Sequence, residues 1–264
     1  MMKLKILLLA SILTLSACKD KTAKVLDYQT EDLDVTTSIY PEAMTKVFDA
    51  HGGVDQWKQM KTLTFTMPKE TGNEITTTDL KSRKAHIDMP HHQLGFDGQE
   101  VWLLNKDTSK YEGNPRFYYN LMFYFYAMPF VLSDDGIIFT DVEPLVVDGT
   151  SHPGIKVSYE SGVGESPEDE YILYYHPETH AMTWLGYTVT YFTKEKSKEF
   201  HYIKYADWQT VNGLVLPKTL EWYTVENNVP TTIRKAVNFT DVQLDEKALD
   251  PERYVKPEDA QVIE

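Results

Sequence analysis

The sequence predicts a mainly β protein in which an antiparallel sheet of about a dozen strands curls around one aromatic helix. Apolar and polar residues alternate in short runs between residues 62 and 244, as in half-buried strands. Turn sequences such as Asp97-Gly98 and Asn212-Gly213 separate these runs. Residues 117–132, in contrast, are apolar on nearly every side. A helix of that kind has to be covered from more than one direction, so we expect the sheet to enclose it.

The N-terminus has the order of a lipoprotein signal peptide. Lys3 and Lys5 precede an apolar run over residues 6–15, and Leu15-Ser16-Ala17-Cys18 resembles a bacterial lipobox. The run is too short for a membrane span, which needs about 20 residues. Cys18 is the only cysteine, so it has no disulfide partner in the chain. We expect a signal peptide over residues 1–17 and palmitate or a similar acyl chain on Cys18; an ordinary secretory signal is the alternative.

The charge balance restricts the partners. The chain has 26 Lys and Arg against 40 Asp and Glu, a net charge of −14. This argues against nucleic acid and against adhesion of the protein surface to anionic headgroups. Attachment to the membrane is therefore expected through the acylated Cys18. Lys19-Asp20 resembles the start of a signal that sends some Bacteroidota lipoproteins to the cell surface, so we expect an outer-membrane lipoprotein facing the periplasm or the cell surface.

One domain is expected over residues 38–250, after a polar tether over residues 18–37 and before a polar C-terminal tail over residues 251–264. Pro41 is suited to a first helical position, and Gly52-Gly53 should end that helix. A second short helical turn is expected over residues 54–60.

Strands are expected at residues 62–67, 75–80, 85–89, 93–96, 100–104, 136–142, 145–147, 154–160, 170–175, 183–192, 199–208, 215–225 and 231–244. Their hairpin-length links favour an antiparallel meander. We expect the outer face of the sheet to be wet, because it is rich in threonine: Thr62, Thr64, Thr66, Thr76, Thr78, Thr188 and Thr190.

The aromatic segment in mid-chain has its own start and stop signals. Asn114 can cap a helix, Pro115 can begin it, and Pro129 should bend or end it. The sequence thus predicts a helix that begins at Pro115 and is bent or ended at Pro129, and an aromatic helix with such a proline break is suited to a lid. Met122 and Met128 would adapt to apolar shapes of different size.

Several motifs resemble the bacterial lipoprotein-carrier superfamily of LolA, LolB and LppX-like half-barrels. They are Ala50-His51-Gly52-Gly53 with Trp57, Phe96-Asp97-Gly98 with Val101-Trp102-Leu103, Pro177-Glu178-Thr179 before Trp184-Leu185-Gly186-Tyr187, and Gly213-Leu214-Val215-Leu216-Pro217. Within it, the chain is most similar to a group of Bacteroidota outer-membrane lipoproteins. The resemblance implies an open antiparallel half-barrel wrapped around helices, with an apolar hollow that holds acyl chains.

Twelve side chains are candidates for lining that hollow, although packing in an ordinary core is the simpler explanation for each one alone. They are Phe65, Met67, Trp102, Phe117, Tyr118, Leu121, Met122, Phe125, Leu185, Tyr187, Trp208 and Trp222.

Metal and catalytic motifs are weak. His176 and His180 are four residues apart, but Pro177 makes this segment a turn rather than a helical metal site. His91-His92, with His86 and Asp88, is expected in an exposed loop. Gly162-Val163-Gly164 lacks the rest of a dinucleotide motif, and no Gly-x-Ser-x-Gly elbow is present. We expect no metal and no cofactor.

Two further groups of polar residues have structural interpretations. The carboxylates of the acidic loop are expected to be solvated rather than a catalytic pair: Glu165, Glu168, Asp169 and Glu170. His51 is expected at a helix C-terminus, where partial positive charge is favourable.

The sequence therefore favours a non-catalytic, monomeric, membrane-anchored lipoprotein that binds a lipid, an acyl chain or the acyl group of a lipoprotein, in envelope transport or homeostasis. Two alternatives stay open: an envelope hydrolase that uses a carboxylate pair, and a scaffold whose sheet edge binds another envelope protein.

Overall fold

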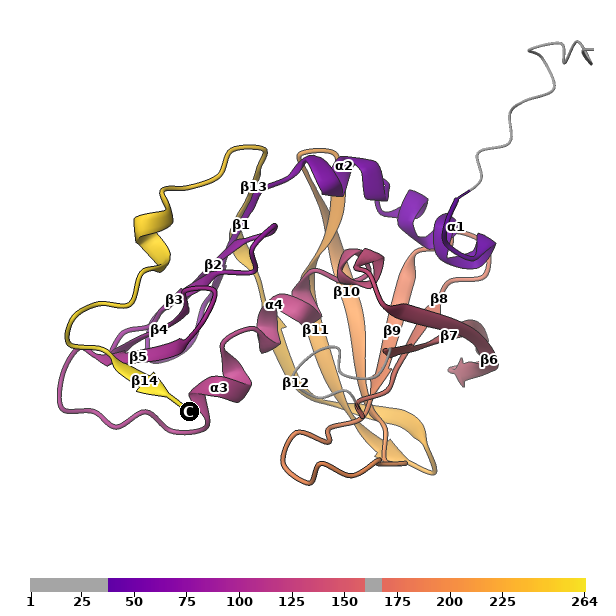
Figure 1. Cartoon of the computed structure of the whole chain (residues 1–264). Coiled ribbons are helices and arrows are strands. Elements are labelled where there is room, and N and C mark those ends of the chain that lie inside the picture. Colours follow the sequence, from indigo (N-terminus) through magenta and orange to yellow (C-terminus); the bar gives the residue numbers. More distant parts are fainter. Residues whose placement is uncertain (1–37, 160–167) are drawn as a thin grey trace, which may run out of the picture. The chain divides into compact units, whose positions relative to one another are not determined.

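The computed structural model describes residues 38–159 and 168–264, and within them fourteen strands form two open, seven-stranded antiparallel sheets (Figure 1). The predicted mainly β, open antiparallel architecture is therefore confirmed. The signal peptide, Cys18, the tether and Gly162-Val163-Gly164 lie outside the described residues and stay predictions. Among the described helices, none has the length and apolar character needed to cross a bilayer.

Sheet A has the strand order β13-β1-β2-β3-β4-β5-β14. Its strands are β1 (Thr62–Met67), β2 (Glu74–Asp79), β3 (Ala85–Asp88), β4 (His92–Phe96), β5 (Val101–Asn105), β13 (Thr240–Asp245) and β14 (Gln261–Ile263). Asp97-Gly98 makes the predicted hairpin turn, in which the Asp97 carboxylate accepts hydrogen bonds from the N–H groups of Gln99 and Glu100.

Sheet B has the strand order β12-β11-β10-β9-β8-β7-β6. Its strands are β6 (Ile137–Val147), β7 (Thr150–Tyr159), β8 (Tyr171–Tyr175), β9 (Met182–Tyr187), β10 (His201–Val211), β11 (Leu214–Glu226) and β12 (Val229–Asn238). Asn212-Gly213 and Asn227-Asn228 adopt positive φ angles in its last two hairpins, as type I′ turns require.

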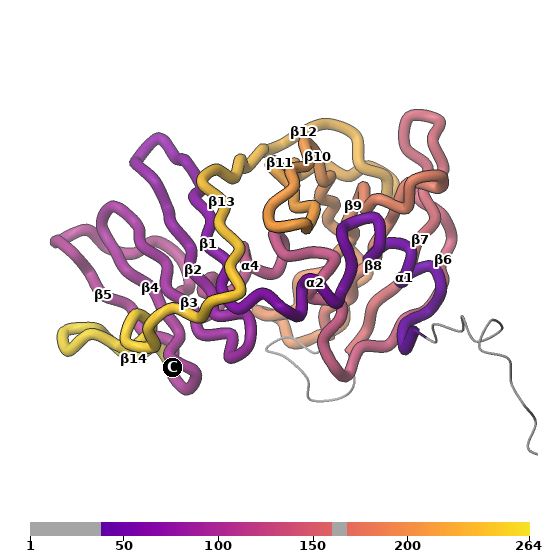
Figure 2. Tube along the Cα trace, turned by 90° about the horizontal axis from the view of Figure 1, so that it is seen from above, coloured from indigo at the N-terminus to yellow at the C-terminus, as the bar shows by residue number. Residues whose placement is uncertain are grey.

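The chain crosses from sheet B to sheet A at Phe239, between β12 and β13 (Figure 2). The single strand predicted over residues 231–244 is thus two strands in different sheets. The predicted strand over 183–192 is also too long, because β9 ends at Tyr187. His86 and His92 lie in β3 and β4 rather than in an exposed loop.

Two short helices precede the first strand, and their positions agree with the predicted stop at Gly52-Gly53. Helix α1 covers Glu42–Ala50 and helix α2 covers Val54–Gln59. His51 follows α1 and is fully buried. Its Nδ1 lies 3.0 Å from Val215 O, and its Nε2 accepts a hydrogen bond from the N–H of Met182 at 3.0 Å. His51 thereby links α1 to β9 and β11.

The environment of His51 corrects the expected positive charge. Burial lowers the pKa of the imidazole to about 4, and the hydrogen bond to Val215 opposes this shift. A neutral ring with the proton on Nδ1 satisfies both hydrogen bonds. His51 is therefore a neutral structural residue at neutral pH, not a favourable charge at a helix end.

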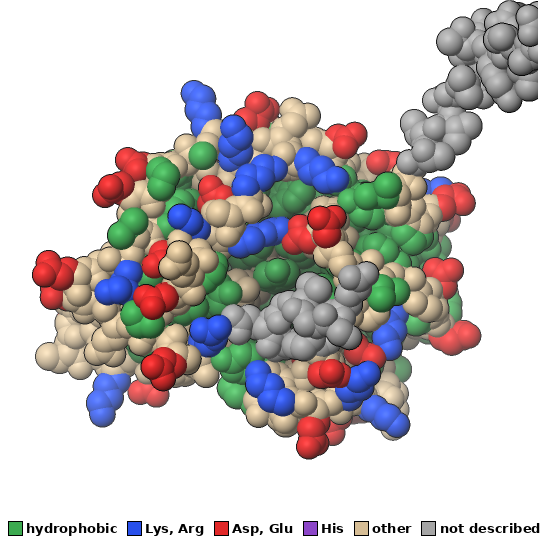
Figure 3. All heavy atoms as spheres, in the orientation of Figure 1, with side chains coloured by type: hydrophobic (Ala, Val, Ile, Leu, Met, Phe, Trp, Pro, Cys, Tyr) green, Lys and Arg blue, Asp and Glu red, His purple; other side chains and the backbone are tan. Residues whose placement is uncertain are grey.

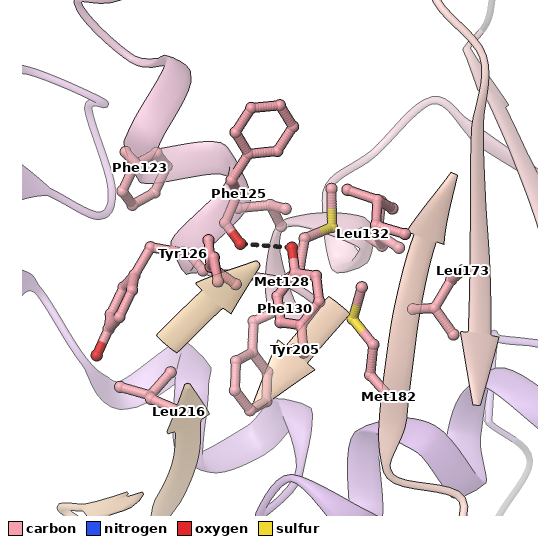
Figure 4. Packing of buried hydrophobic residues seen from close by; sticks show 14 of the residues in the cluster. Phe123, Phe125, Tyr126, Met128, Phe130, Leu132, Leu173, Met182, Tyr205 and Leu216 are labelled. Carbon is pink, nitrogen blue, oxygen red and sulfur yellow. Dashed lines mark hydrogen bonds between the residues drawn. The ribbon is translucent and has the colours of Figure 1, made fainter. Parts of the chain in front are cut away.

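The mid-chain segment is enclosed by both sheets, as its apolar composition required. It consists of helix α3 (Pro115–Tyr118), helix α4 (Leu121–Tyr126) and the 3₁₀ helix η1 (Phe130–Ser133). Tyr126 packs against Phe65 of sheet A at a ring-centre distance of 4.6 Å. The Tyr205 hydroxyl of sheet B donates to Phe125 O at 2.6 Å (Figure 4).

The expectation of a wet threonine face is wrong. Thr64 is half-buried, and the other six threonines of the predicted set are buried: Thr62, Thr66, Thr76, Thr78, Thr188 and Thr190. The reason is the register. Thr76 is opposite Phe65, and Thr78 is opposite Leu63, and directly opposite residues point to the same face of a sheet. Part of the threonine set therefore faces inward, toward the aromatic segment.

The C-terminal tail packs onto sheet A. Its strand β14 pairs with β5, and Tyr254 of the 3₁₀ helix η2 (Pro251–Tyr254) is buried. Tyr254 O accepts a hydrogen bond from Trp102 Nε1 at 3.3 Å. The Trp102 ring in turn covers Gly95, where a Cβ would lie 2.2 Å from Trp102 Cζ2. Trp102 is thus a structural link between β4, β5 and the tail.

The buried His51 predicts a specific loss of stability in acid. Because its folded pKa is below the unfolded value of 6.5, its contribution is fully present above pH 6.5 and is lost as the pH falls toward 4. The loss is roughly 3 kcal/mol over that interval. In His51→Gln, urea unfolding should give a lower free energy of unfolding at pH 7.5. That free energy should also depend less on pH between pH 6.5 and pH 4 than it does in the wild type. The exposed His201→Gln variant should keep the wild-type slope; equal slopes in all three proteins would contradict the prediction.

Gly95→Ala should lower the free energy of unfolding by about 1–3 kcal/mol, because the added methyl group would overlap the rigid Trp102 ring. Chemical denaturation followed by tryptophan fluorescence measures this change. The matched control is Gly186→Ala in β9, where the nearest atom to a Cβ is Tyr202 Cε1 at 3.3 Å. A Gly95 variant as stable as the Gly186 variant would show that Trp102 moves aside freely.

Candidate functional site

The aromatic segment is not one continuous helix. It consists of short helices separated by non-helical residues, and the cavities of the site lie beside them. Asn114 caps α3 as predicted, because its side chain accepts a hydrogen bond from Phe117 N at 3.0 Å. The helix begins at Pro115 and is interrupted before η1 at Pro129, as expected. The expectation of one continuous helix up to that point is wrong, because α3 ends at Tyr118 and α4 begins at Leu121. Residues of these short helices line two cavities.

The first cavity, which we call the apolar pocket, has a volume of about 700 Å³ and is partly open to solvent. It lies beside α3 and α4, between the end of β1 and the strands β9, β11 and β12. Its apolar lining includes Phe125, Trp222 and Val237. The Phe125 ring is 5.0 Å from Tyr187 and 5.9 Å from Trp222. The face of the protein drawn in Figure 3 has a hollow in which hydrophobic side chains are visible between charged ones, although most of the surface around it is polar.

Eight of the twelve candidate side chains line the apolar pocket. They are Met67, Phe117, Tyr118, Leu121, Met122, Phe125, Tyr187 and Trp222. They come from sheet A, the aromatic segment and sheet B, so only the fold brings them together. Whether they bind a ligand stays a prediction.

The other four candidates lie elsewhere in the interior. Phe65 is fully buried between Tyr126 and Phe239, and Leu185 is fully buried in the core. Trp208 lies with its ring 4.5 Å from His51. Trp102 covers Gly95, as described above. These four pack the framework and are not among the lining residues of the pocket.

A second cavity of about 640 Å³, the polar pocket, lies on the other side of the break. Its polar lining includes Thr78 of β2 and Tyr159 of β7, together with five charged residues: Arg83 of the β2–β3 turn, Arg116 of α3, Asp134 and Asp135 after η1, and Asp169 before β8. Arg83 Nη2 lies 2.6 Å and 2.5 Å from the two carboxylate oxygens of Asp134. The pocket therefore contains an ion pair, hydroxyl groups, a second arginine and two further carboxylates.

Asp169 corrects the expectation of a solvated acidic loop. It is buried, and its Oδ1 accepts hydrogen bonds from Thr190 N at 2.6 Å and from Thr190 Oγ1 at 2.7 Å. Burial raises the pKa of its carboxyl, and the bonds from Thr190 oppose the shift. Glu170 is engaged differently, in an ion pair with Lys156 at 2.6 Å. Glu165 lies outside the described residues.

Burial shifts the pKa values of four further groups in the lining of the polar pocket. Burial raises the pKa of the Asp134 carboxyl, although Arg83 opposes this. Burial also raises the pKa values of the hydroxyls of Tyr124, Tyr159 and Tyr171. These hydroxyls stay protonated at neutral pH and can donate hydrogen bonds.

The two pockets meet at four shared lining residues: Phe117, Leu121, Asp169 and Tyr171. Phe117 also touches the segment after β9, with ring-centre distances of 5.1 Å to both Tyr191 and Phe192. Sequence reasoning missed Asp169, Tyr171 and Phe192. Tyr171 lies in a strand that the sequence predicts, but nothing near it in the sequence indicates which other side chains lie on the same face of the sheet.

The histidine pair is in a turn, as predicted. His176 Nδ1 accepts hydrogen bonds from the N–H groups of Glu178 and Thr179 at 3.2 Å and 3.3 Å. In residues 38–159 and 168–264, no group of three or more His, Cys, Asp or Glu side chains is arranged to hold a metal ion.

Three solved structures of bacterial proteins are similar to this chain. A LolA superfamily protein from Nitrosomonas europaea is 7% identical, with a TM-score of 0.44 over 74% of this chain and 88% of that chain. A DUF1329 family protein from Desulfovibrio piger is 9% identical, with a TM-score of 0.43 over 75% and 91%. A putative outer membrane lipoprotein-sorting protein domain from Vibrio parahaemolyticus is 6% identical, with a TM-score of 0.36 over 75% and 93%.

Comparison with the curated proteins gives no match. Residues 99–238, more than half of the chain, match the model of a family described as "Family of unknown function (DUF6503)". The chain therefore belongs to the DUF6503 family.

Proposed function

We propose that this protein is an envelope lipoprotein, anchored through the acylated Cys18, which binds an acyl chain or another long hydrocarbon in the apolar pocket. Its net charge of −14 leaves the acyl anchor as the means of membrane attachment. The proposed role is to hold or carry a lipid rather than to alter it.

The lining of the apolar pocket is the observation that supports this proposal. The volume of the apolar pocket, about 700 Å³, lies in the range of small-molecule sites. Met67 and Met122 can adapt to chains of different shape, and Phe125 and Trp222 supply large apolar surfaces. Burying hydrocarbon contributes about 0.8 kcal/mol for each methylene group, so a long chain could offset the cost of association.

The carboxylates of the polar pocket are the strongest argument for the hydrolase alternative. Asp134 and Asp169 line the same cavity and both have raised pKa values. Each already has close partners, however: Arg83 pairs with Asp134, and Thr190 donates two hydrogen bonds to Asp169. A carboxylate held in an ion pair is poorly suited to general acid catalysis. We therefore favour binding.

Photolabelling tests the proposal on the full-length, acylated protein in lipid nanodiscs. Palmitic acid that carries a diazirine is added to the protein, and the sample is irradiated. The labelled residues are then mapped by mass spectrometry. The expected labels are on side chains of the apolar pocket, such as Met122 and Trp222. Labels confined to other surfaces of residues 38–264 would contradict the proposal.

Ala236→Trp should reduce this labelling, because Ala236 lines the apolar pocket from β12 and is exposed. A ring that displaces two methylenes of the ligand should weaken binding about tenfold, measured as the probe concentration at half-maximal labelling. Ile233→Trp on the same strand is the matched control, because Ile233 is 54% exposed and is not among the pocket's lining residues. Equal labelling of both variants would place the ligand elsewhere.

A further inference from the structure

We propose that the polar pocket binds a polyhydroxyl headgroup, such as a sugar, on a lipid whose hydrocarbon chain lies in the apolar pocket. This inference rests on the proposed function and names the class of ligand: a glycolipid rather than a free fatty acid or an ionic phospholipid.

The geometry allows one ligand to occupy both cavities. Phe117, Leu121, Asp169 and Tyr171 line both pockets, so the cavities adjoin at the break between α3 and α4. The two sides differ in chemistry. The apolar pocket has Met122, Phe125 and Trp222, with Lys69, Arg234 and Lys235 also in its lining. The polar pocket has an ion pair and several hydroxyl groups. An amphipathic molecule matches this division.

Two polar atoms at the polar pocket have unused hydrogen-bonding capacity. Thr78 is 2% exposed and lines the cavity, yet its Oγ1 has no hydrogen-bond partner in the described part of the chain. Arg83 Nη1 is buried and likewise has no such partner there. Buried polar groups are nearly always satisfied, and leaving one unsatisfied destabilises the protein. A ligand in the cavity would supply the missing partners.

Arg83 is held rigidly in place for such a contact. It lies in the turn between β2 and β3 with a φ angle of 61°, a conformation that is uncommon for residues other than glycine. The Asp79 carboxylate fixes this turn by accepting hydrogen bonds from Lys81 N, Ser82 N and Ser82 Oγ. The guanidinium carbon is 5.2 Å from the centre of the Phe123 ring. Little side-chain entropy is therefore lost when a ligand binds.

The balance of groups favours hydroxyls over an ionic headgroup. Two arginines and three aspartates line the cavity, so it has no excess of positive charge for an anionic headgroup. The charge of Arg83 is opposed by Asp134, and the remaining capacity at its Nη1 is that of a donor. Asp169 uses Oδ1 for both bonds from Thr190 and retains acceptor capacity at its other oxygen. Protonated tyrosines add donors. A hydroxyl group both donates and accepts, so a sugar can satisfy this mixed set.

The test uses three diazirine lipids that have the same C16 chain and differ in the headgroup: a glucoside, a methyl ester and a phosphocholine. Each is added to the acylated protein in nanodiscs. The glucoside should reach half-maximal labelling of the apolar pocket at about tenfold lower concentration than the methyl ester, as expected from two added hydrogen bonds. Thr78→Val and Arg83→Lys should each reduce the preference for the glucoside over the methyl ester. Thr64→Val is the control, because Thr64 faces away and bonds to Thr77.

The outcomes separate the two proposals. Equal labelling by glucoside and methyl ester, or stronger labelling by phosphocholine, would overturn the sugar assignment while the proposed hydrocarbon site stands. A preference that survives in both Thr78→Val and Arg83→Lys would also overturn it. No labelling of the apolar pocket by any of the three lipids would overturn the proposed function and this inference together. Thermal unfolding of each variant confirms that it is folded.

Discussion

The burial of α4 between two sheets is the constraint on which the rest of the structure depends. Tyr126 packs on Phe65 and Phe239, and Phe125 packs on Tyr187 and Trp222. A helix that is apolar all round cannot be covered by a single flat surface. Both sheets are therefore required, and the chain joins them by crossing at Phe239.

The same arrangement produces the two cavities. Because α3 and α4 are short and separated by Tyr119-Asn120, the enclosed segment does not fill the space between the sheets. The apolar pocket lies on the side of β9, β11 and β12, and the polar pocket lies on the side of the β2–β3 turn, β7 and β8. The interior is thus neither completely packed nor one continuous apolar hollow. Its chemistry changes across the junction at Phe117 and Asp169.

Local patterns predicted local structure well. Alternation placed most strands to within a few residues, and Asn114 predicted the cap of α3 correctly. The failures have physical reasons. The wet threonine face was wrong because register, not alternation alone, decides which side Thr76 and Thr78 share. Asp169 was assigned to a solvated loop because nothing near it in sequence indicates that Thr190 lies beside it.

What the sequence by itself determined was the mainly β class, the turns, the enclosed aromatic segment and eight of the side chains that line the apolar pocket. These follow from periodicity and composition, which are local properties. The tertiary structure alone decided that the segment is broken, that His51 is neutral and that Arg83, Asp134 and Asp169 share a cavity. Those features depend on contacts between residues far apart in the chain, which local sequence patterns do not encode.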